Sequence, residues 1–221
     1  MTPERLAEVL GPNIYHLAPP ESRRQIEMHG LLSPRAQGEL LGFDDLRMHR
    51  LMTTRRKTSE RLAQGHVLND NSPLSFKRLE GLLENGLSPQ DWMEELNSRV
   101  FLFPNRKAVS SFLQARANRN RARDLWAFPT LRFLNKYWDK IEVTHMNSGA
   151  TVQSSPPRRG LSTYANAKEL DFDAWRRRRK ERGEIKGLDS VKEVCVYHSA
   201  PGAAELSDRP VLMSPPHSAL T

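Results

Sequence analysis

The sequence has only one cysteine, Cys195, among its 221 residues, which excludes any disulfide within the chain. A zinc site built from several cysteines is excluded for the same reason. The scarcity of cysteine is typical of a reducing compartment. Because Cys195 stands between Val194 and Val196, we expect a buried structural thiol rather than a nucleophile.

Long apolar runs are also lacking. No run approaches the roughly 20 residues that a membrane helix requires. Residues 1–6 show neither the basic flank nor the apolar core of a signal peptide. We therefore expect a cytoplasmic protein with no membrane partner.

Several common site motifs are missing as well. The sequence has no Gly-x-Gly-x-x-Gly, no phosphate-binding loop with Lys-Ser/Thr, no His-x-x-x-His pair and no Gly-x-Ser-x-Gly elbow. We therefore expect no Rossmann nucleotide site, no metal site and no serine hydrolase chemistry.

The order of apolar patterns and turn signals predicts the fold class. Helices are expected over residues 2–10, 21–29, 44–64, 75–83, 88–96, 107–123, 130–139 and 172–182. Strands are expected over residues 14–17, 99–103, 125–130, 141–144 and 191–197. The elements do not alternate strictly as strand and helix, so a doubly wound parallel sheet is not expected. We predict one α+β domain over residues 1–207.

Two segments are expected outside the regular elements. Residues 149–161 are rich in Gly, Pro and Ser, which predicts a mobile loop. Residues 208–221 contain three prolines, which predicts an extended tail rich in Pro and Ser.

Positive charge is concentrated in one block. Residues 101–182 contain 18 Lys/Arg and 7 Asp/Glu, whereas the whole chain has a net charge of +8. A field of one sign attracts polyanions and speeds their encounter. We interpret the block as a nucleic-acid-binding surface, the alternative being a solvated face that only aids solubility.

The residues expected to contact phosphates lie in three groups within this block. They are Arg116, Arg119, Arg121 and Arg123; Arg158 and Arg159; and Arg176, Arg177, Arg178 and Arg179. Guanidinium contacts to phosphates would give affinity without sequence preference.

Three short segments stand out in the rest of the chain. The first, over residues 14–33, is a strand with Tyr15 and His16, then a helix that closes at Gly30–Leu31. The second, over residues 99–106, is an apolar strand that runs into proline, asparagine and arginine. The third, over residues 191–201, is a late strand in which a glutamate precedes aliphatic residues and a proline follows.

In this order the three segments resemble ADP-ribosyltransferases, specifically the DarT-like toxins that modify DNA and their relatives. The resemblance extends over roughly residues 14–204 and implies a split mixed β-sheet with flanking helices. It further implies that NAD is the substrate, that DNA or RNA is the acceptor, and that the protein is a toxin or phage-defence effector with a possible antitoxin partner. No metal is implied.

The resemblance also implies roles for individual residues. Glu193 would stabilise the oxocarbenium-like ribose and deprotonate the acceptor, and Arg106 would hold the pyrophosphate or position the acceptor. His16 would bind a ribose hydroxyl. The further residues assigned to the NAD pocket are Tyr15, Gly30, Leu31, Phe101, Phe103 and Ser162. Ser162-Thr163-Tyr164 is the candidate for the second pocket motif of the family, although it follows a loop rather than an obvious strand.

Each assignment has a purely structural alternative. His16 would then be a half-buried histidine with a satisfied hydrogen bond, Arg106 one more member of a basic helix, and Glu193 the solvent-facing residue of an edge strand. At the level of function, the alternatives are a non-enzymatic basic module that binds nucleic acid and an enzyme that hydrolyses NAD without an acceptor.

Overall fold

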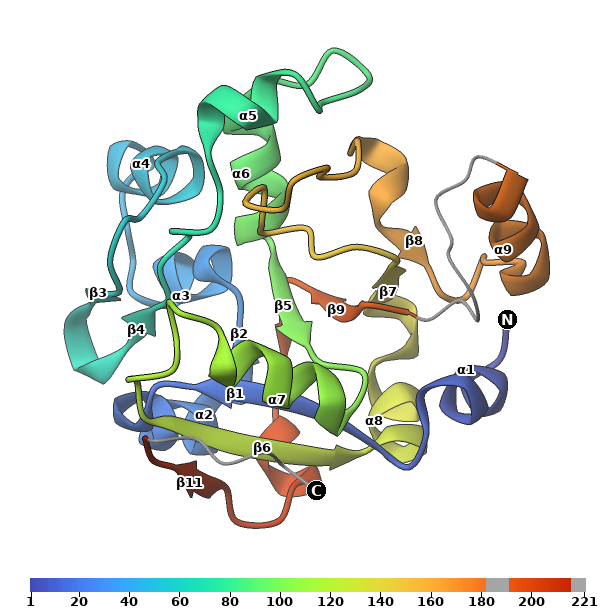
Figure 1. The fold of residues 1–221 in the computed structure, drawn as a ribbon. Helices are drawn as coiled ribbons and strands as arrows, with labels where there is room; N and C mark the ends of the chain where they lie inside the picture. The colour runs from blue at the N-terminus through green and yellow to red at the C-terminus, as the bar shows by residue number, and fades with distance from the viewer. Residues whose placement is uncertain (182–190, 216–221) are drawn as a thin grey trace.

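Two antiparallel sheets form the centre of the protein in a computed structural model, which describes residues 1–181 and 191–215 (Figure 1). In the first sheet, β6 (Arg123–Pro129) lies between β1 (Asn13–Ala18) and β11 (Val211–Met213). In the second, the order is β5 (Arg99–Leu102), β9 (Glu193–Tyr197), β7 (Ile141–Thr144) and β8 (Ala165–Asn166). Helices and small sheets surround both, so the chain folds as one mixed α/β domain.

The two sheets meet at one point. Tyr15 of β1 and Phe103, which directly follows β5, exchange both backbone hydrogen bonds, at 2.9 and 2.7 Å. Beyond this bridge, a side chain links β1 to β5 in place of backbone hydrogen bonds. His16 Nδ1 lies 2.9 Å from the carbonyl oxygen of Phe101, within hydrogen-bond distance. The His16 ring therefore lies in the gap where the two strands diverge.

Two further pairs of short strands complete the β structure. Strand β2 (Leu31–Leu32) pairs with β10 (Ser199–Ala200), and β3 (Glu60–Arg61) pairs with β4 (Val67–Leu68). The first pair brings the segment after α2 (Arg23–His29) against the segment after β9. The chain regions near residues 16, 31, 101 and 199 are thus neighbours.

The remaining helices cover these sheets (Figure 1). They are α1 (Pro3–Leu10), α3 (Pro34–Leu40), α4 (Asp45–Thr53), α5 (Phe76–Glu80), α6 (Pro89–Asn97), α7 (Arg106–Gln114), α8 (Thr130–Tyr137) and α9 (Phe172–Glu181). Helix α6 begins with a capping box, in which Ser88 and Asp91 each accept a hydrogen bond from the other's backbone N–H group. None of the described helices combines the length and the apolar character needed to cross a bilayer.

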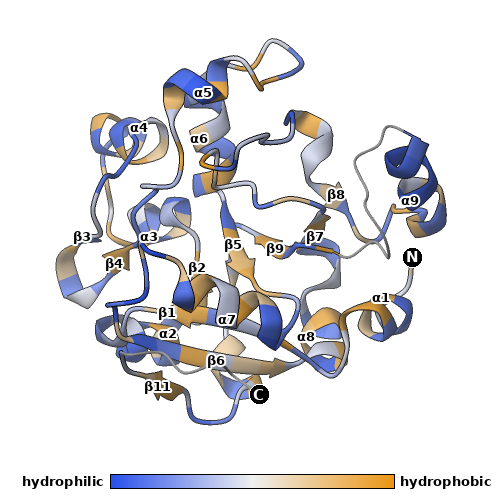
Figure 2. Cartoon of the chain, in the orientation of Figure 1, coloured by the Kyte–Doolittle hydropathy of each residue, from blue (hydrophilic) through white to orange (hydrophobic). Residues whose placement is uncertain are grey.

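Alternation along β9 sends its side chains into two different cores. Val194 and Val196 are fully buried in the largest apolar cluster, with Ile141 and Val143 of the neighbouring strand. Cys195 is buried on the other face, where α6 covers the sheet. Glu193 shares the face of Cys195, because side chains two residues apart in a strand point the same way. Figure 2 shows the apolar colouring of the central strands and the hydrophilic α9.

Three expectations on element boundaries are wrong. The basic helix predicted over residues 107–123 ends at Gln114, and the helix predicted over 44–64 ends at Thr53. Residues 211–213 form strand β11 on β6 and are not part of an extended tail. Residues 216–221 of that tail, and residue 182 of the last predicted helix, lie outside the described residues.

Gly30 provides a test of the close packing between β2 and β10. Its φ is +75°, and a Cβ atom added there would overlap the carbonyl oxygen of Ala200. We expect Gly30→Ala to lower the free energy of unfolding by about 1–2 kcal/mol for the backbone conformation and by a further ~1–3 kcal/mol for the clash.

The control for that test is Gly42→Ala. Gly42 also has a positive φ, +66°, but a Cβ atom added there would have no neighbour within 4 Å. Urea denaturation of both variants should show the larger loss at Gly30. Equal losses would mean that the contact with Ala200 is not stabilising.

Candidate active site

Glu193 is the first residue of β9 and lies in the interior of its sheet. It pairs with Thr144 of β7, and the next residue pairs with Leu102 of β5. Because β9 has neighbours on both sides, the alternative of an edge-strand residue facing solvent is wrong. The Glu193 side chain is half-buried.

The partner of this carboxylate is Ser148, in the loop after β7. The Ser148 hydroxyl donates to Glu193 Oε2 at 2.7 Å, and the Ser148 backbone N–H donates to the same oxygen at 3.2 Å. Burial raises the pKa of Glu193 to about 7, although these bonds and the charge of Arg159 act in the opposite direction. Near neutral pH the group therefore exists in both protonation states.

Arg159 holds the loop that carries Ser148. Its guanidinium is almost fully buried and donates to the carbonyl oxygens of Ser148 at 3.1 Å, Ala150 at 3.2 Å and Pro157 at 3.2 Å. Burial lowers the pKa of this arginine. Its sequence assignment as a phosphate contact is therefore wrong, because the loop's own carbonyl groups occupy the guanidinium.

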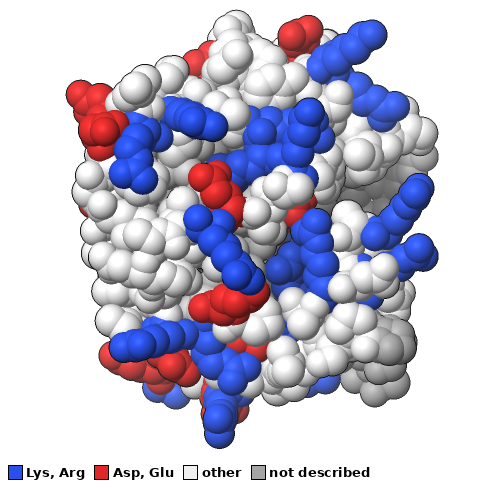
Figure 3. Space-filling model, turned by 90° about the vertical axis from the view of Figure 1, so that its left-hand side faces the viewer, with Lys and Arg blue, Asp and Glu red and all other residues white. Residues whose placement is uncertain are grey.

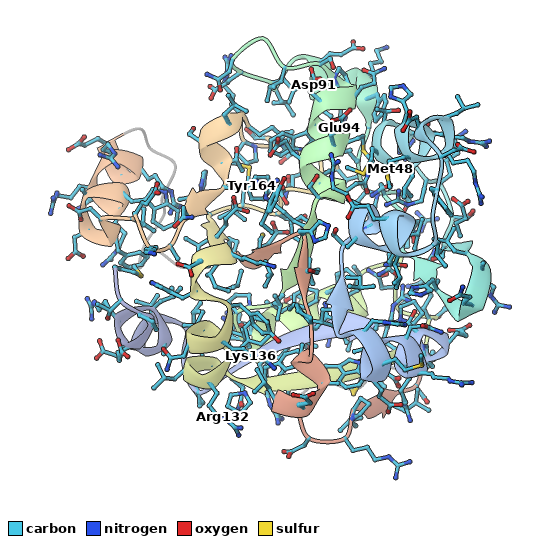
Figure 4. The ribbon with its side chains drawn as sticks, turned by 180° about the vertical axis from the view of Figure 1, so that it is seen from behind. Met48, Asp91, Glu94, Arg132, Lys136 and Tyr164 are labelled. Carbon is cyan, nitrogen blue, oxygen red and sulfur yellow. The ribbon has the colours of Figure 1, made fainter. Side chains whose placement is uncertain are left out.

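Tyr164 forms the apolar wall beside this network. Its ring stacks on Trp92 of α6 at a centroid distance of 5.7 Å, and the Arg99 guanidinium lies 3.9 Å from the centroid of the same tyrosine ring. Figure 4 shows Tyr164 in the interior between α6 and the sheet. Burial and the nearby Cys195 and Glu193 raise its pKa well above the usual range. Tyr164 is therefore buried near Glu193, whereas Ser162, which the sequence assigned to the NAD pocket, is exposed.

Arg99 shows how the polar face of the second sheet is neutralised. Its guanidinium donates to both carboxylate oxygens of Glu142, at 2.6 and 3.0 Å, and to Glu95 at 2.7 Å. This arginine is thus committed to a structural ion pair. No comparable ion pair reaches Glu193 among the described residues, and Ser148 is the residue that hydrogen-bonds to this carboxylate.

His16 is half-buried, and its Nδ1 atom shares a hydrogen bond with the Phe101 carbonyl oxygen. Burial lowers the pKa of His16, and the positive charge of Arg123 adds to this effect. The imidazole is therefore neutral at pH 7. Tyr15, the preceding residue, is buried under α7 with Phe103 and packs in the core there.

The structure brings some of the predicted residues together and separates others. Tyr15, His16, Phe101, Phe103 and Glu193 lie on adjoining strands.

Gly30 and Leu31 lie against β10, at the opposite end of β5 from Phe103. Arg106 is exposed at the first turn of α7, where Asn105 caps the helix. Pockets of about 360 and 370 Å³ are not lined by His16, Arg106 or Glu193.

The basic residues divide into exposed and buried sets. Arg116, Arg119, Arg177 and Arg178 are exposed, as a phosphate contact requires, and Arg176 is half-buried over Phe172. Arg158 is exposed but forms an ion pair with Glu84 at 3.0 Å, and Arg121 forms one with Asp70.

Arg123 and Arg179 are 5% exposed, so their assignment to an open nucleic-acid-binding surface is wrong. Arg179 packs its guanidinium on the Trp175 ring, 4.2 Å from the centroid. Arg123 instead lines the pocket of about 370 Å³.

The sequence assigned Arg159 to phosphates and not to the packing of a loop, and it gave Ser148 and Tyr164 no individual role beside Glu193. The segment Ser162-Thr163-Tyr164 contains Tyr164, whose pKa the nearby Glu193 raises, and alternation along β9 places Glu193 on the face of Cys195. Nothing in the sequence around Ser148 distinguishes it from an ordinary turn.

The raised pKa of Glu193 makes a prediction about stability. Between pH 4.5, the ordinary value, and pH about 7, the folded protein retains a proton that the unfolded chain has released. The free energy of unfolding therefore falls as pH rises through this window. Glu193→Gln lacks this titration, so it should gain stability relative to wild type by about 1–3 kcal/mol between pH 5 and pH 8.

Denaturant titrations at several pH values would measure this difference, with Glu169→Gln, an exposed glutamate, as the control. If the free energies of unfolding of wild type and Glu193→Gln differ by the same amount at every pH from 5 to 8, the pKa of Glu193 is not raised.

Comparison with known proteins identifies the family but not the activity. A model of DUF7002, a family of unknown function, matches residues 12–207. No curated protein and no solved structure shows a significant match to the chain. The match covers most of the chain and all of the strands described above except β11, and the protein therefore belongs to the DUF7002 family.

Proposed function

We propose that the protein is a NAD-dependent ADP-ribosyltransferase that modifies DNA or RNA and acts as a toxin or phage-defence effector. The observation that carries the proposal is the carboxylate of Glu193, which is half-buried on a central strand with a serine as its only hydrogen-bond partner among the described residues. A carboxylate in this setting is suited to stabilise a developing positive charge.

The arrangement of the strands supports the proposal. The two sheets adjoin at the Tyr15–Phe103 bridge and diverge at His16. We propose that this divergence is the opening of an ADP-ribosyltransferase-like split sheet. If the register of β5 and β9 is extended by one residue, Glu193 lies opposite Phe103, which in turn lies opposite Tyr15 of β1. The histidine, the aromatic strand and the glutamate thus follow one another across neighbouring strands.

In the proposed reaction the bond between the ribose C1′ atom and the nicotinamide nitrogen breaks, and nicotinamide leaves with the electron pair. The ribose passes through an oxocarbenium-like state that the Glu193 carboxylate stabilises. A nucleophilic atom of the nucleic acid then bonds to C1′, and its proton passes to Glu193. The pKa of about 7 suits both the charged and the proton-accepting role.

Access to Glu193 depends on the loop after β7. Ser148 covers the carboxylate, and Arg159 ties this loop to itself through the carbonyl groups of Ser148 and Ala150. We propose that NAD displaces Ser148 from Glu193 when it binds. Exposed Arg106, at the first turn of α7, would then contact the pyrophosphate or the acceptor.

Exposed arginines support nucleic acid as the acceptor. Arg177 and Arg178 on α9, and Arg116 and Arg119 after α7, are the part of the basic block that remains open to phosphates. Because such contacts carry little sequence information, the modified base would be selected at the active site.

The direct test is incubation of the protein with NAD labelled in the adenosine part, in the presence of single-stranded DNA or RNA. We expect transfer of label to the nucleic acid and release of nicotinamide. Glu193→Gln should lower the rate about 10²–10⁴-fold, the range for loss of an acid–base group. The exposed Glu169→Gln variant should retain wild-type activity.

The same assay separates the alternatives. Free ADP-ribose as the sole product would identify a NAD glycohydrolase. Absence of nicotinamide with every acceptor, together with salt-dependent binding of nucleic acid, would exclude the enzyme and favour a basic binding module.

A further inference from the structure

A pocket of about 370 Å³ lies at the end of β1, away from Glu193. Its walls come from the segment after β1, the β3–β4 hairpin and the start of β6. The lining residues that carry charge are Glu21, Arg61, Arg121 and Arg123. Figure 3 shows the face of the molecule that carries α4 and the β3–β4 hairpin, where basic and acidic side chains alternate.

Arg123 is the unusual member of this group. The residue is 5% exposed, and among the residues that the structure describes no hydrogen bond or ion pair engages its guanidinium. Burial lowers its pKa, and the charge of Arg121 adds to this effect. Arg123 lines the pocket, so an anionic ligand bound there would give this cation a partner.

The neighbouring carboxylates are all engaged by other arginines. Asp124, the next residue, receives two hydrogen bonds from Arg23, at 2.7 and 2.5 Å. Asp70 is paired with Arg121, and Glu21 is paired with Arg61 at 3.0 Å. Asp70 and Glu21 offset the charge of Arg123 only at a distance, and no carboxylate among the described residues forms an ion pair with it.

We propose that this pocket binds a phosphate group of a nucleotide substrate, with Arg123 as the central contact and Arg61 and Arg121 at the sides. A guanidinium donates two parallel hydrogen bonds to a phosphate, which suits a buried site better than a lysine would. The volume accommodates a phosphate with part of its nucleoside.

The pocket lies near His16 of the proposed active site. Arg123 is close enough to His16 for its charge to lower the pKa of that imidazole. Pro19 and Pro20, which line the pocket, follow His16 on the same chain segment. The phosphate belongs either to the pyrophosphate of NAD or to the backbone of the nucleic acid, and this choice alone rests on the proposed function.

The experiment is calorimetric titration of the full chain with inorganic pyrophosphate. We expect binding by wild type, and a loss of about tenfold or more in affinity for Arg123→Gln, as for removal of a charge-assisted hydrogen bond. Arg50→Gln, which removes an exposed arginine of α4 that does not line the pocket, should bind as wild type does.

Because Arg123 is buried, Arg61→Gln provides a second variant that leaves the core untouched. Arg61 has 78% of its side chain exposed and should also bind pyrophosphate more weakly than wild type. Glu21→Gln should bind more tightly, since it frees Arg61. Absence of binding by wild type, or unchanged affinity in both Arg123→Gln and Arg61→Gln, would overturn the proposal.

Competition identifies the source of the phosphate. Displacement of pyrophosphate by NAD in wild type would assign the pocket to NAD, and displacement only by a short oligonucleotide would assign it to the acceptor. Displacement by neither would overturn the assignment to a nucleotide substrate. All of these experiments measure binding, so they test the pocket even if the protein transfers no ADP-ribose. Conversely, if the protein transfers ADP-ribose but binds no pyrophosphate, the pocket proposal fails and the proposed reaction stands.

Discussion

Desolvation of the Glu193 carboxylate is the constraint on which the chemistry proposed for this protein depends. Val194 and Val196 fix β9 in the main core, and alternation then places Glu193 and Cys195 on the opposite face under α6. On that face Arg99 is neutralised by Glu142 and Glu95, whereas within residues 1–181 and 191–215 Glu193 has only the hydroxyl and N–H of Ser148 as hydrogen-bond donors. A position that costs stability and perturbs a pKa in this way is characteristic of functional sites.

The positive charge of the chain is used in three different ways. Some arginines are structural, such as Arg159, which organises a loop, and Arg179, which packs on Trp175. Others are exposed and lie on α9 and after α7. Arg123 belongs to neither group, because it is buried and yet faces a pocket. The net charge of a segment therefore says little about which of its residues meet a ligand.

The sequence predicted the elements whose signals are local. Proline at the first helical position and a capping serine located α6, and the apolar run after residue 98 located β5. The basic helix was extended too far because arginine has a high helix propensity, but between Leu113 and Leu125 no large apolar residue anchors a further turn. Strands β2 and β10 have two residues each and are defined by their pairing, which no local pattern reveals.

Residues of the candidate site could likewise be predicted only where they lie in segments with a local sequence signal. The resemblance selected Tyr15, His16, Phe101, Phe103 and Glu193 from strand segments, and the structure shows that these strands are neighbours.

The partners supplied by loops were not found. Arg159 is buried, whereas arginine is usually exposed. Ser148 contacts Glu193 because the loop after β7 folds back over the sheet. Ordering of a loop by contacts distant in sequence is a tertiary effect that composition does not encode.

The most direct measurement is the titration of the Glu193 carboxyl carbon by NMR, with Glu193→Gln used to assign the resonance. We predict a midpoint near pH 7 in the free protein. With NAD bound, the positive nicotinamide ring beside the carboxylate should lower that midpoint. A midpoint near the ordinary value of 4.5, or one that NAD leaves unchanged, would contradict the placement of the NAD site at Glu193.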